Sequence, residues 1–323
     1  RAGAGQRPLG GDMSTLWAFP GQGAQQPGML HHLPDSPIVQ ACLAEAGEVL
    51  GESVLALDTA EALRATRAVQ LCLLIAGVAG ARLLLARDAR PDYVAGLSIG
   101  AYAAAVVAGA LAFADAVRLV ALRGELMQQA YPEGYGMTAI LGLDLASLER
   151  LLAAVNSAEL PVYLANINAD NQLIIAGSEA AMQRVAERAR SMGAGMAKPL
   201  AVSVPSHCAL LAAPAAQLAA AFAGVTVQRP SVRYLSSSSA RLISDPEKLR
   251  DDLAHNMCRV VDWQGTLQTA FERGVRLHLE LPPGNVLSGL ARRVFEPGMA
   301  IAFQGSRLDT LDAMLRQEVN RSR

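Results

Sequence analysis

The feature that most constrains this chain is the run Gly96-Leu97-Ser98-Ile99-Gly100, which joins a strand-like segment to a helix-like one. The preceding Pro91–Ala95 is short and partly β-branched, and the following Ala101–Val107 is rich in helix formers. A G-x-S-x-G run in this setting is typical of the nucleophile elbow, a sharp turn that presents a serine hydroxyl at the end of a sheet. Glycine flanks the turn because a side chain there would crowd it. An ordinary strand–helix junction has a similar composition, so the run alone leaves both interpretations open.

Length and composition indicate a globular α/β protein and argue against two classes of partner. The 323 residues are 52% hydrophobic and only 4% aromatic, enough for one large domain or two with a substantial core. A formal net charge of −1 provides no electrostatic attraction to nucleic acid or to an anionic membrane. The longest apolar stretch, residues 69–85, contains Gln70 and Arg82, so we expect a buried helix there rather than a membrane span.

The cysteines and the first residues carry expectations about compartment and processing. Four cysteines are scattered with no spacing that suits zinc: Cys42, Cys72, Cys208 and Cys258. This pattern predicts a reduced, cytoplasmic protein without a disulfide or a metal site. Residues 1–12 are rich in glycine and arginine and precede Met13, so we interpret them as a cloning remnant or a disordered tail.

Strand and helix patterns alternate over most of the chain. We expect strands at 15–19, 93–98, 232–236, 276–281 and 300–303. We expect helices at 66–87, 99–109, 113–130, 209–223, 246–254, 264–273 and 286–295, with a last one from Asp309. Such alternation predicts an α/β fold with a doubly wound, mostly parallel sheet, like that of the α/β-hydrolases.

The pattern changes between these parts, at residues 133–203. Strands are expected at 136–142, 162–168, 172–176 and 196–202, and helices at 144–158 and 179–192. The order β-α-β-β-α-β is that of a ferredoxin-like unit. We therefore expect a large α/β-hydrolase-like catalytic domain made of residues 13–132 and 204–323, with a ferredoxin-like small domain of residues 133–203 inserted into it.

A serine hydroxyl becomes a good nucleophile only when a base removes its proton, so a histidine must lie within hydrogen-bond reach. The chain has five candidates: His31, His32, His207, His255 and His278. His207 is the best candidate because it ends a rigid turn that returns from the insert, where a cleft between domains is expected. The others have simpler explanations, namely a polar surface loop for the first two, a helix end for His255 and a strand for His278.

Two further features are open to more than one interpretation. The glycine-rich turn Phe19–Gln25 ends the first strand, so the backbone amides of Gln22 and Ile99 are candidate donors for an oxyanion hole, although the turn taken alone favours a purely structural role. Arg123 lies in an apolar stretch of helix, where it needs a carboxylate partner unless it faces solvent.

Together these segments resemble the malonyl-CoA:acyl-carrier-protein transacylase family, from Met13 to about Phe303. The resemblance rests on Phe19–Gln25, Gly96–Gly100, Leu122–Gly124 with Met127, Asn168 with Gln172 and Gly177, Val204–Cys208, and Pro283–Leu287. It implies a malonyl-CoA:acyl carrier protein malonyltransferase with an α/β-hydrolase-like core and a ferredoxin-like insert, in agreement with the fold expected above.

The resemblance also implies roles for individual residues. Ser98 would be acylated by malonyl-CoA, with His207 as general base and then general acid, and with the amides of Gln22 and Ile99 holding the oxyanion. Arg123 would bind the free malonyl carboxylate. The backbone carbonyl of Asn256, at a position where glutamine is more usual, would orient His207. Gln70 and Asn168 align with polar residues that line the family's cleft and bind substrate. The resemblance further implies that no cofactor is bound permanently and that CoA is a substrate.

Two departures point to a branch of the family. Leu97 replaces the histidine, and Ala101 the glutamate, that are usual in the fatty-acid-synthesis enzymes. With the downstream segment Tyr131–Met137, they look more like the epsilon subunit of bacterial malonate decarboxylase, which implies a carrier subunit with a dephospho-CoA-type thiol arm as acceptor. The alternative is a transacylase of fatty-acid or polyketide synthesis, whose acyl carrier protein bears phosphopantetheine.

Functions outside the family remain as hypotheses. A serine esterase or thioesterase would share the elbow but needs an acidic third residue, and no obvious acid precedes His207 at a strand end. A non-catalytic scaffold subunit would not need Ser98 at all.

Overall fold

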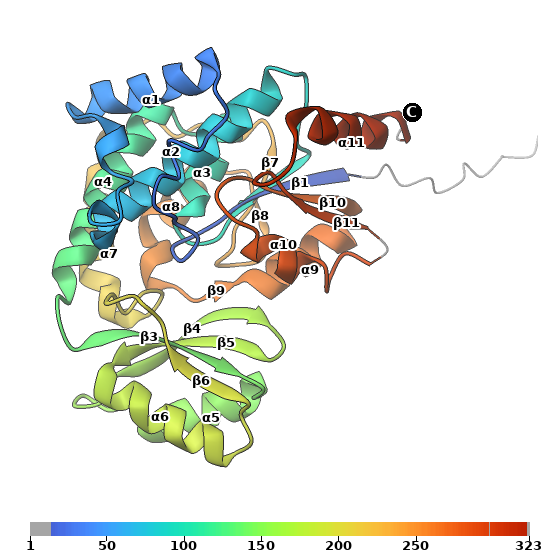
Figure 1. The fold of residues 1–323 in the computed structure, drawn as a ribbon. Coiled ribbons are helices and arrows are strands. Elements are labelled where there is room, and N and C mark those ends of the chain that lie inside the picture. Colours follow the sequence, from blue (N-terminus) through green and yellow to red (C-terminus); the bar gives the residue numbers. More distant parts are fainter. Residues whose placement is uncertain (1–13, 297, 322–323) are drawn as a thin grey trace, which may run out of the picture.

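The computed structural model describes residues 14–296 and 298–321, so the remnant or tail expected at residues 1–12 lies outside the described residues. The described chain forms two layered parts that lie one above the other in Figure 1. The upper part is built around a six-stranded sheet and the lower part around a five-stranded one. This mixed α/β architecture agrees with the fold class expected from the alternating pattern.

The large sheet has the order β11-β10-β1-β2-β7-β8. Its strands are β1 (Ser14–Phe19), β2 (Tyr93–Gly96), β7 (Arg233–Leu235), β8 (Leu242–Ile243), β10 (Val275–Glu280) and β11 (Met299–Ala302). All neighbours pair in parallel except β7 with β8. The predicted mostly parallel sheet is therefore confirmed, and β8 is an addition that the sequence pattern did not indicate. Parallel strands place their carboxyl ends at one edge, where the turns after β1 and β2 meet.

Helices cover both faces of this sheet. They are α1 (Pro37–Leu50), α2 (Thr66–Leu85), α3 (Gly100–Val107), α4 (Phe113–Ala130), α7 (Ala212–Ala221), α8 (Pro246–His255), α9 (Trp263–Glu272), α10 (Val286–Ala291) and α11 (Leu308–Arg321). In Figure 1, α1, α2 and α4 lie together on one side, and α9 and α10 on the other. Helix α11 packs on the same side as α1 and α2, because Leu311 and Leu315 share their core cluster. Most ends fall within three residues of the expected ones, but the helix expected at 209–223 is α7 flanked by 3-10 turns at Ala209–Leu211 and Phe222–Gly224.

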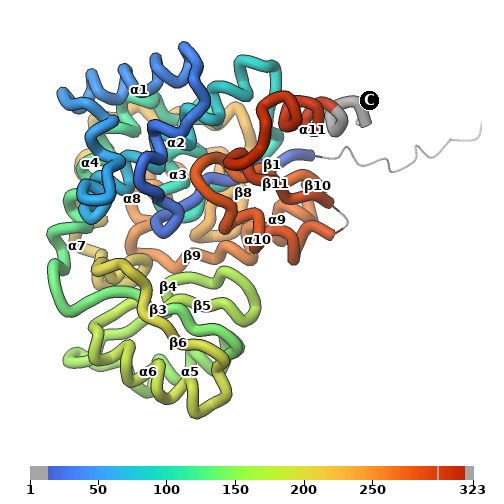
Figure 2. The backbone as a smooth tube through the Cα atoms, viewed as in Figure 1, coloured from blue at the N-terminus to red at the C-terminus, as the bar shows by residue number. Residues whose placement is uncertain are grey.

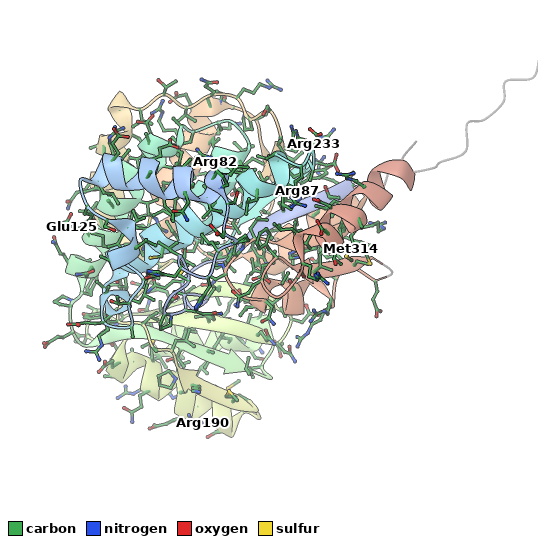
Figure 3. All side chains as sticks on the ribbon, turned by 45° about the horizontal axis from the view of Figure 1, so that its top comes forward. Arg82, Arg87, Glu125, Arg190, Arg233 and Met314 are labelled. Atoms are coloured by element: carbon green, nitrogen blue, oxygen red, sulfur yellow. The ribbon has the colours of Figure 1, made fainter. Side chains whose placement is uncertain are left out.

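Helix α2 is the apolar segment that could be mistaken for a membrane span. Among the described residues it is the one helix long and apolar enough to cross a membrane, and 89% of its most apolar window is buried inside the protein. Near its C-terminal end, Arg82 pairs with Glu45 of α1 at 2.9 Å, and Arg87, just after the helix, pairs with Asp309 of α11 at 3.2 Å. The side chains of these two arginines, labelled in Figure 3, are 33% and 37% exposed. The predicted buried core helix is confirmed.

The small sheet has the order β6-β3-β5-β4-β9. Its strands are β3 (Tyr135–Leu141), β4 (Val162–Ala169), β5 (Gln172–Ser178), β6 (Met196–Pro199) and β9 (Val261–Asp262), and its helices are α5 (Leu145–Val155) and α6 (Glu179–Ser191). Both helices pack on the face of the sheet that is turned away from the large sheet (Figure 1). Helix α5 begins where expected, because Asp144 accepts the amide of Ser147 as its N-cap.

Strand β9 is the element that joins the two parts. It comes from the C-terminal half of the chain, yet it pairs in parallel with β4, matching Asn166 with Val261 and Ile167 with Asp262. The sequence pattern predicted four strands for this sheet, and two residues are too short a run to show a period. Figure 2 shows the chain passing between the two parts at the end of α4 and again after β6. The small sheet is therefore held by a strand pairing as well as by these two connections.

Candidate active site

The nucleophile elbow is present at the carboxyl end of β2. Strand β2 is buried along its length, Ser98 adopts a left-handed φ of 58°, and α3 begins at Gly100. A side chain at Gly96 would collide with the backbone of Gly100, and one at Gly100 would collide with the carbonyl oxygen of Phe19. Both glycines are therefore required by close backbone approach, as the pattern predicted.

His207 lies against this serine although it is 109 residues away in sequence. Its Nε2 is 2.8 Å from Ser98 Oγ, and its Nδ1 is 2.8 Å from the carbonyl oxygen of Asn256 and 3.2 Å from that of Arg259. A carbonyl oxygen only accepts, so Nδ1 carries the proton and Nε2 is free to accept the hydroxyl proton of Ser98. The sequence-predicted pair is thus brought together, and the carbonyl of Asn256 lies where the resemblance implied.

The environment keeps this imidazole neutral. Burial and, to a smaller extent, the charge of Arg123 lower the pKa of His207 to about 4, although the hydrogen bonds to the carbonyls of Asn256 and Arg259 act in the opposite direction. An imidazole with such a pKa is unprotonated at neutral pH, which is the form that a general base needs. Among the described residues, no carboxylate contacts His207, so the acidic third residue expected of a serine hydrolase is not found there.

Ser98 and His207 open into a cavity of about 440 Å³ between the two sheets. The turn after β1, the elbow, β4, the segment after β6 and the start of α10 line it: Pro20 to Gln25, Leu97, Met137, Asn166, Asn168, Ile174, Leu200 to Val202, Val204, Ser206, Val286, Leu287 and Leu290. Gln22 belongs to this lining, and Ile99 directly follows Ser98. Among the described residues, the amide of neither donates a hydrogen bond, so both are available to a bound oxygen.

Arg123 is held differently from the expectation. Its side chain is fully buried on α4, and its hydrogen bonds run from Nη1 to Gln70 Oε1 and from Nη2 to Asn256 Oδ1, each at 2.9 Å. No carboxylate lies within ion-pair distance of it in the described part of the chain, and its Nε has no partner there. Burial excludes the solvent-facing alternative, and within the described residues two neutral amides hold the arginine rather than a carboxylate. The charge is buried without a counter-ion, which a bound anion would relieve.

The polar residues carried over from the resemblance separate into two groups. Asn168 lines the cavity, as implied, whereas the fully buried Gln70 does not, because its amide lies between Arg123 and Met127. Asn166 was not predicted, although it stands two residues before Asn168 and so points to the same face of β4. The side-chain oxygens of both asparagines are buried without a partner among the described residues. The alternation Asn-Ile-Asn was the signal available in the sequence.

The remaining titratable candidates lie elsewhere. His31 is half-exposed and pairs with Asp58, and His255 ends α8 and contacts the carbonyl oxygen of Asp251, as its position predicted. His278 is fully buried in β10, with neither ring nitrogen hydrogen-bonded to a described residue. All four cysteines are free thiols, and the described residues contain no cluster of His, Cys, Asp or Glu that could hold a metal ion.

The comparisons with known proteins agree with this geometry. The acyl transferase domain family matches residues 16–308. The chain is 40% identical over 287 residues to the malonyl CoA-acyl carrier protein transacylase of Salmonella typhimurium, which covers 87% of this chain and 92% of that protein. It is 34% identical over 281 residues to the transacylase of the same name from Bacillus subtilis, which covers 85% and 89% respectively.

Solved structures give the same result. The crystal structure of FabD from Acinetobacter baumannii matches with a TM-score of 0.89 at 36% identity, over 96% of this chain and 99% of that chain. A malonyl-transacylase in complex with a type II PKS acyl-carrier protein matches with a TM-score of 0.84 at 38% identity, over 90% of this chain and 94% of that one.

Proposed function

Because this chain belongs to the acyl transferase domain family, we propose that it moves a malonyl group from malonyl-CoA to the thiol of an acyl carrier protein. The observation that carries this proposal is the 2.8 Å contact between Ser98 Oγ and His207 Nε2, beside a buried arginine whose partners are both neutral. The contact provides an activated nucleophile, and the arginine provides a charge that a free carboxylate would neutralise.

The first half of the reaction forms an ester on Ser98. His207 Nε2 takes the hydroxyl proton while Oγ attacks the thioester carbonyl, and the negative oxygen that develops is held by the amides of Gln22 and Ile99. Collapse of this tetrahedral species breaks the carbon–sulfur bond, and the imidazolium returns the proton to the sulfur of CoA. The malonyl group remains on Ser98.

The second half reverses these steps with another thiol. The carrier thiol gives its proton to His207 Nε2 and attacks the ester, and Ser98 Oγ leaves with that proton. Both thiols are carried on an arm that contains amide groups. Asn166 and Asn168 offer side-chain oxygens that lack partners in the described structure, so we assign them to the recognition of that arm.

Arg123 selects the acyl group in this scheme. Its guanidinium binds the free carboxylate of malonyl in a bidentate pair, which an acetyl group cannot supply. Gln70 supports this residue from behind rather than contacting the substrate, because its Oε1 already accepts from Arg123.

The nature of the carrier separates the two branches of the family. The relatives reported above are named as acyl carrier protein transacylases, which favours a transacylase of fatty-acid or polyketide synthesis over the malonate decarboxylase subunit that the sequence first indicated. Leu97, at the cavity, and Ala101, in α3, remain as the features that favour the decarboxylase branch. We therefore propose a phosphopantetheine-bearing acyl carrier protein as the acceptor.

The finer description of the fold belongs to the same proposal. The antiparallel order β6-β3-β5-β4 and the two helices on one face support a ferredoxin-like class for residues 133–203. The elbow at the carboxyl end of a parallel sheet supports an α/β-hydrolase-like class for residues 13–132 and 204–323. We keep both assignments, together with a cytoplasmic location.

One experiment tests the function. The protein and its Ser98→Ala variant are incubated with malonyl-CoA, first alone and then with a phosphopantetheine-bearing acyl carrier protein or with a dephospho-CoA-armed carrier. We expect intact-mass spectra to show a malonyl adduct on the protein but not on the variant, and then malonyl on the first carrier. Release of free malonate instead would indicate a hydrolase, delivery mainly to the second carrier would restore the decarboxylase branch, and an adduct on the variant would place the nucleophile elsewhere.

A further inference from the structure

Asn256 makes three contacts that join separate parts of the active site. Its backbone carbonyl accepts from His207 Nδ1 at 2.8 Å, its side-chain Oδ1 accepts from Arg123 Nη2 at 2.9 Å, and its Nδ2 donates to the carbonyl oxygen of Ser98 at 3.0 Å. The residue is 2% exposed and follows the last residue of α8. One residue thus contacts the base, the buried cation and the strained elbow.

The orientation of the Asn256 amide follows from its partners. A guanidinium has only donors, so the atom facing Arg123 must be the oxygen, and a backbone carbonyl only accepts, so the atom facing Ser98 must be the nitrogen. An aspartate of the same shape would keep the first contact. It would replace the second with two oxygens facing each other.

The charge of the amide matters as much as its shape. Gln70 holds the other side of Arg123 and is also neutral, so both hydrogen-bonding partners position the guanidinium without cancelling its charge. A carboxylate in either place would form an internal ion pair that a substrate carboxylate would have to displace.

We propose that Asn256 determines acyl specificity as a positioning residue. Its side chain fixes Arg123 and the Ser98 elbow and leaves the charge of the arginine free for the acyl carboxylate. This role rests on the proposed function, because only a charged acyl group can use the free guanidinium. It differs from the role of the backbone carbonyl, which any residue at the position would supply. A purely structural side chain would only fill space between α4, α8 and the elbow.

Two substitutions distinguish charge from shape. Asn256→Asp keeps the shape and adds a charge, whereas Asn256→Gln keeps the neutral amide and adds one methylene. We expect Asn256→Asp to raise the KM for malonyl-CoA and to lower the preference for malonyl-CoA over acetyl-CoA, measured as the ratio of kcat/KM values, by at least tenfold, and Asn256→Gln to keep that preference within a few-fold. The reverse order, with Gln worse than Asp, or equal effects of the two would overturn the proposal.

A matched control and an assay that needs no malonyl complete the test. Asn156→Asp adds the same charge at the end of α5, where Asn156 accepts from Val162 away from the cavity, so neither assay should change. The pH dependence of Ser98 modification by a sulfonyl fluoride reports the protonation of His207. A carboxylate at position 256 favours the imidazolium form of His207. Asn256→Asp should therefore move the acid midpoint, the pH at which the rate of Ser98 modification falls to half on the acid side, to higher pH, while Asn256→Gln should not.

The two assays separate the inference from the function beneath it. If the wild-type protein transfers no malonyl group, the proposed function fails, and the sulfonyl fluoride profile still decides whether Asn256 controls the charges around His207. An unmoved midpoint in a folded Asn256→Asp protein overturns the inference even where malonyl transfer by the wild type is demonstrated.

Discussion

Individual residues of the candidate active site are held in conformations and surroundings that cost free energy. Ser98 and His207 both have left-handed backbone angles, with φ of 58° and 63°, and such non-glycine residues cost of the order of 1–3 kcal/mol each. The backbone N–H of His207 donates to the carbonyl oxygen of Met257 at 2.7 Å, and the side-chain Nδ2 of Asn256 donates to the carbonyl oxygen of Ser98, so a hydrogen bond to the backbone fixes each strained residue. The uncompensated charge of Arg123 adds a further cost, which a bound carboxylate removes.

Removal of that charge should affect one substrate and not another. We expect Arg123→Ala to lower kcat/KM for malonyl-CoA by roughly two to four orders of magnitude, because breaking a buried ion pair costs about 3–5 kcal/mol. The value for acetyl-CoA should change little, since acetyl offers the guanidinium no partner. Steady-state kinetics with both thioesters would measure this difference. Equal losses with the two donors would remove Arg123 from its assigned role.

At the scale of elements, a buried carboxylate holds the helix that forms one wall of the cavity. Glu280 ends β10 and accepts the amide of Ser288 at 2.8 Å, its hydroxyl at 2.9 Å and the amide of Leu287 at 3.2 Å. Burial raises the pKa of Glu280, and its hydrogen bonds from Ser288 and Leu287 oppose that rise. These hydrogen bonds anchor the start of the short helix α10, which carries Leu287 and Leu290 into the cavity lining.

We expect Glu280→Gln to lower the free energy of unfolding by about 1–3 kcal/mol, because a neutral amide of the same shape leaves one buried donor without an acceptor. Urea unfolding at neutral pH would measure the change. Ser288→Ala is the matched control, since it removes only the hydroxyl bond and keeps both backbone bonds, so its effect should be smaller. A Glu280→Gln protein as stable as the wild type would show that α10 does not need the carboxylate.

At the scale of the whole molecule, two buried neutral histidines link folding to pH. Burial lowers the pKa of His278 from its ordinary value of 6.5 to about 4. The pKa of His207 is lowered from 6.5 to about 4 as well. As the pH falls, both histidines therefore become protonated in the unfolded chain at a higher pH than in the folded protein. Their contribution to stability is present above pH 6.5 and is lost between pH 6.5 and 4, to the extent of about 3 kcal/mol for each histidine.

His278→Leu tests this linkage without touching the active site. The ring makes no hydrogen bond to a described residue and packs beside Phe295, so an apolar side chain of similar size should be tolerated at neutral pH. We expect the variant to lose less stability than the wild type between pH 7 and pH 5, measured by urea unfolding at both values. Parallel losses in the two proteins would contradict the assignment. The exposed His32 provides the control, because His32→Leu should leave the pH dependence unchanged.

Several parts of the fold could be predicted because their signals are local. The elbow glycines, the start of α5 at Asp144 and the bounds of α4 depend on backbone sterics, capping and periodicity within a few residues. Helix α1 was not among the expected elements, although Ser36 caps its start, proline follows, and Gly51 ends it in a left-handed conformation. These start and stop residues are a local helix signal that the sequence contains.

Other features depended on segments that meet only in the folded chain. The sequence by itself determined the alternating α/β order, the turn at Ser98 and the candidacy of His207, because these follow from residue types at short spacing. Only the tertiary structure decided that two amides hold Arg123, that Asn166 shares the cavity with Asn168, and that β9 joins the small sheet. Such contacts link positions tens to more than a hundred residues apart, and the packing of the two sheets brings them within hydrogen-bond distance.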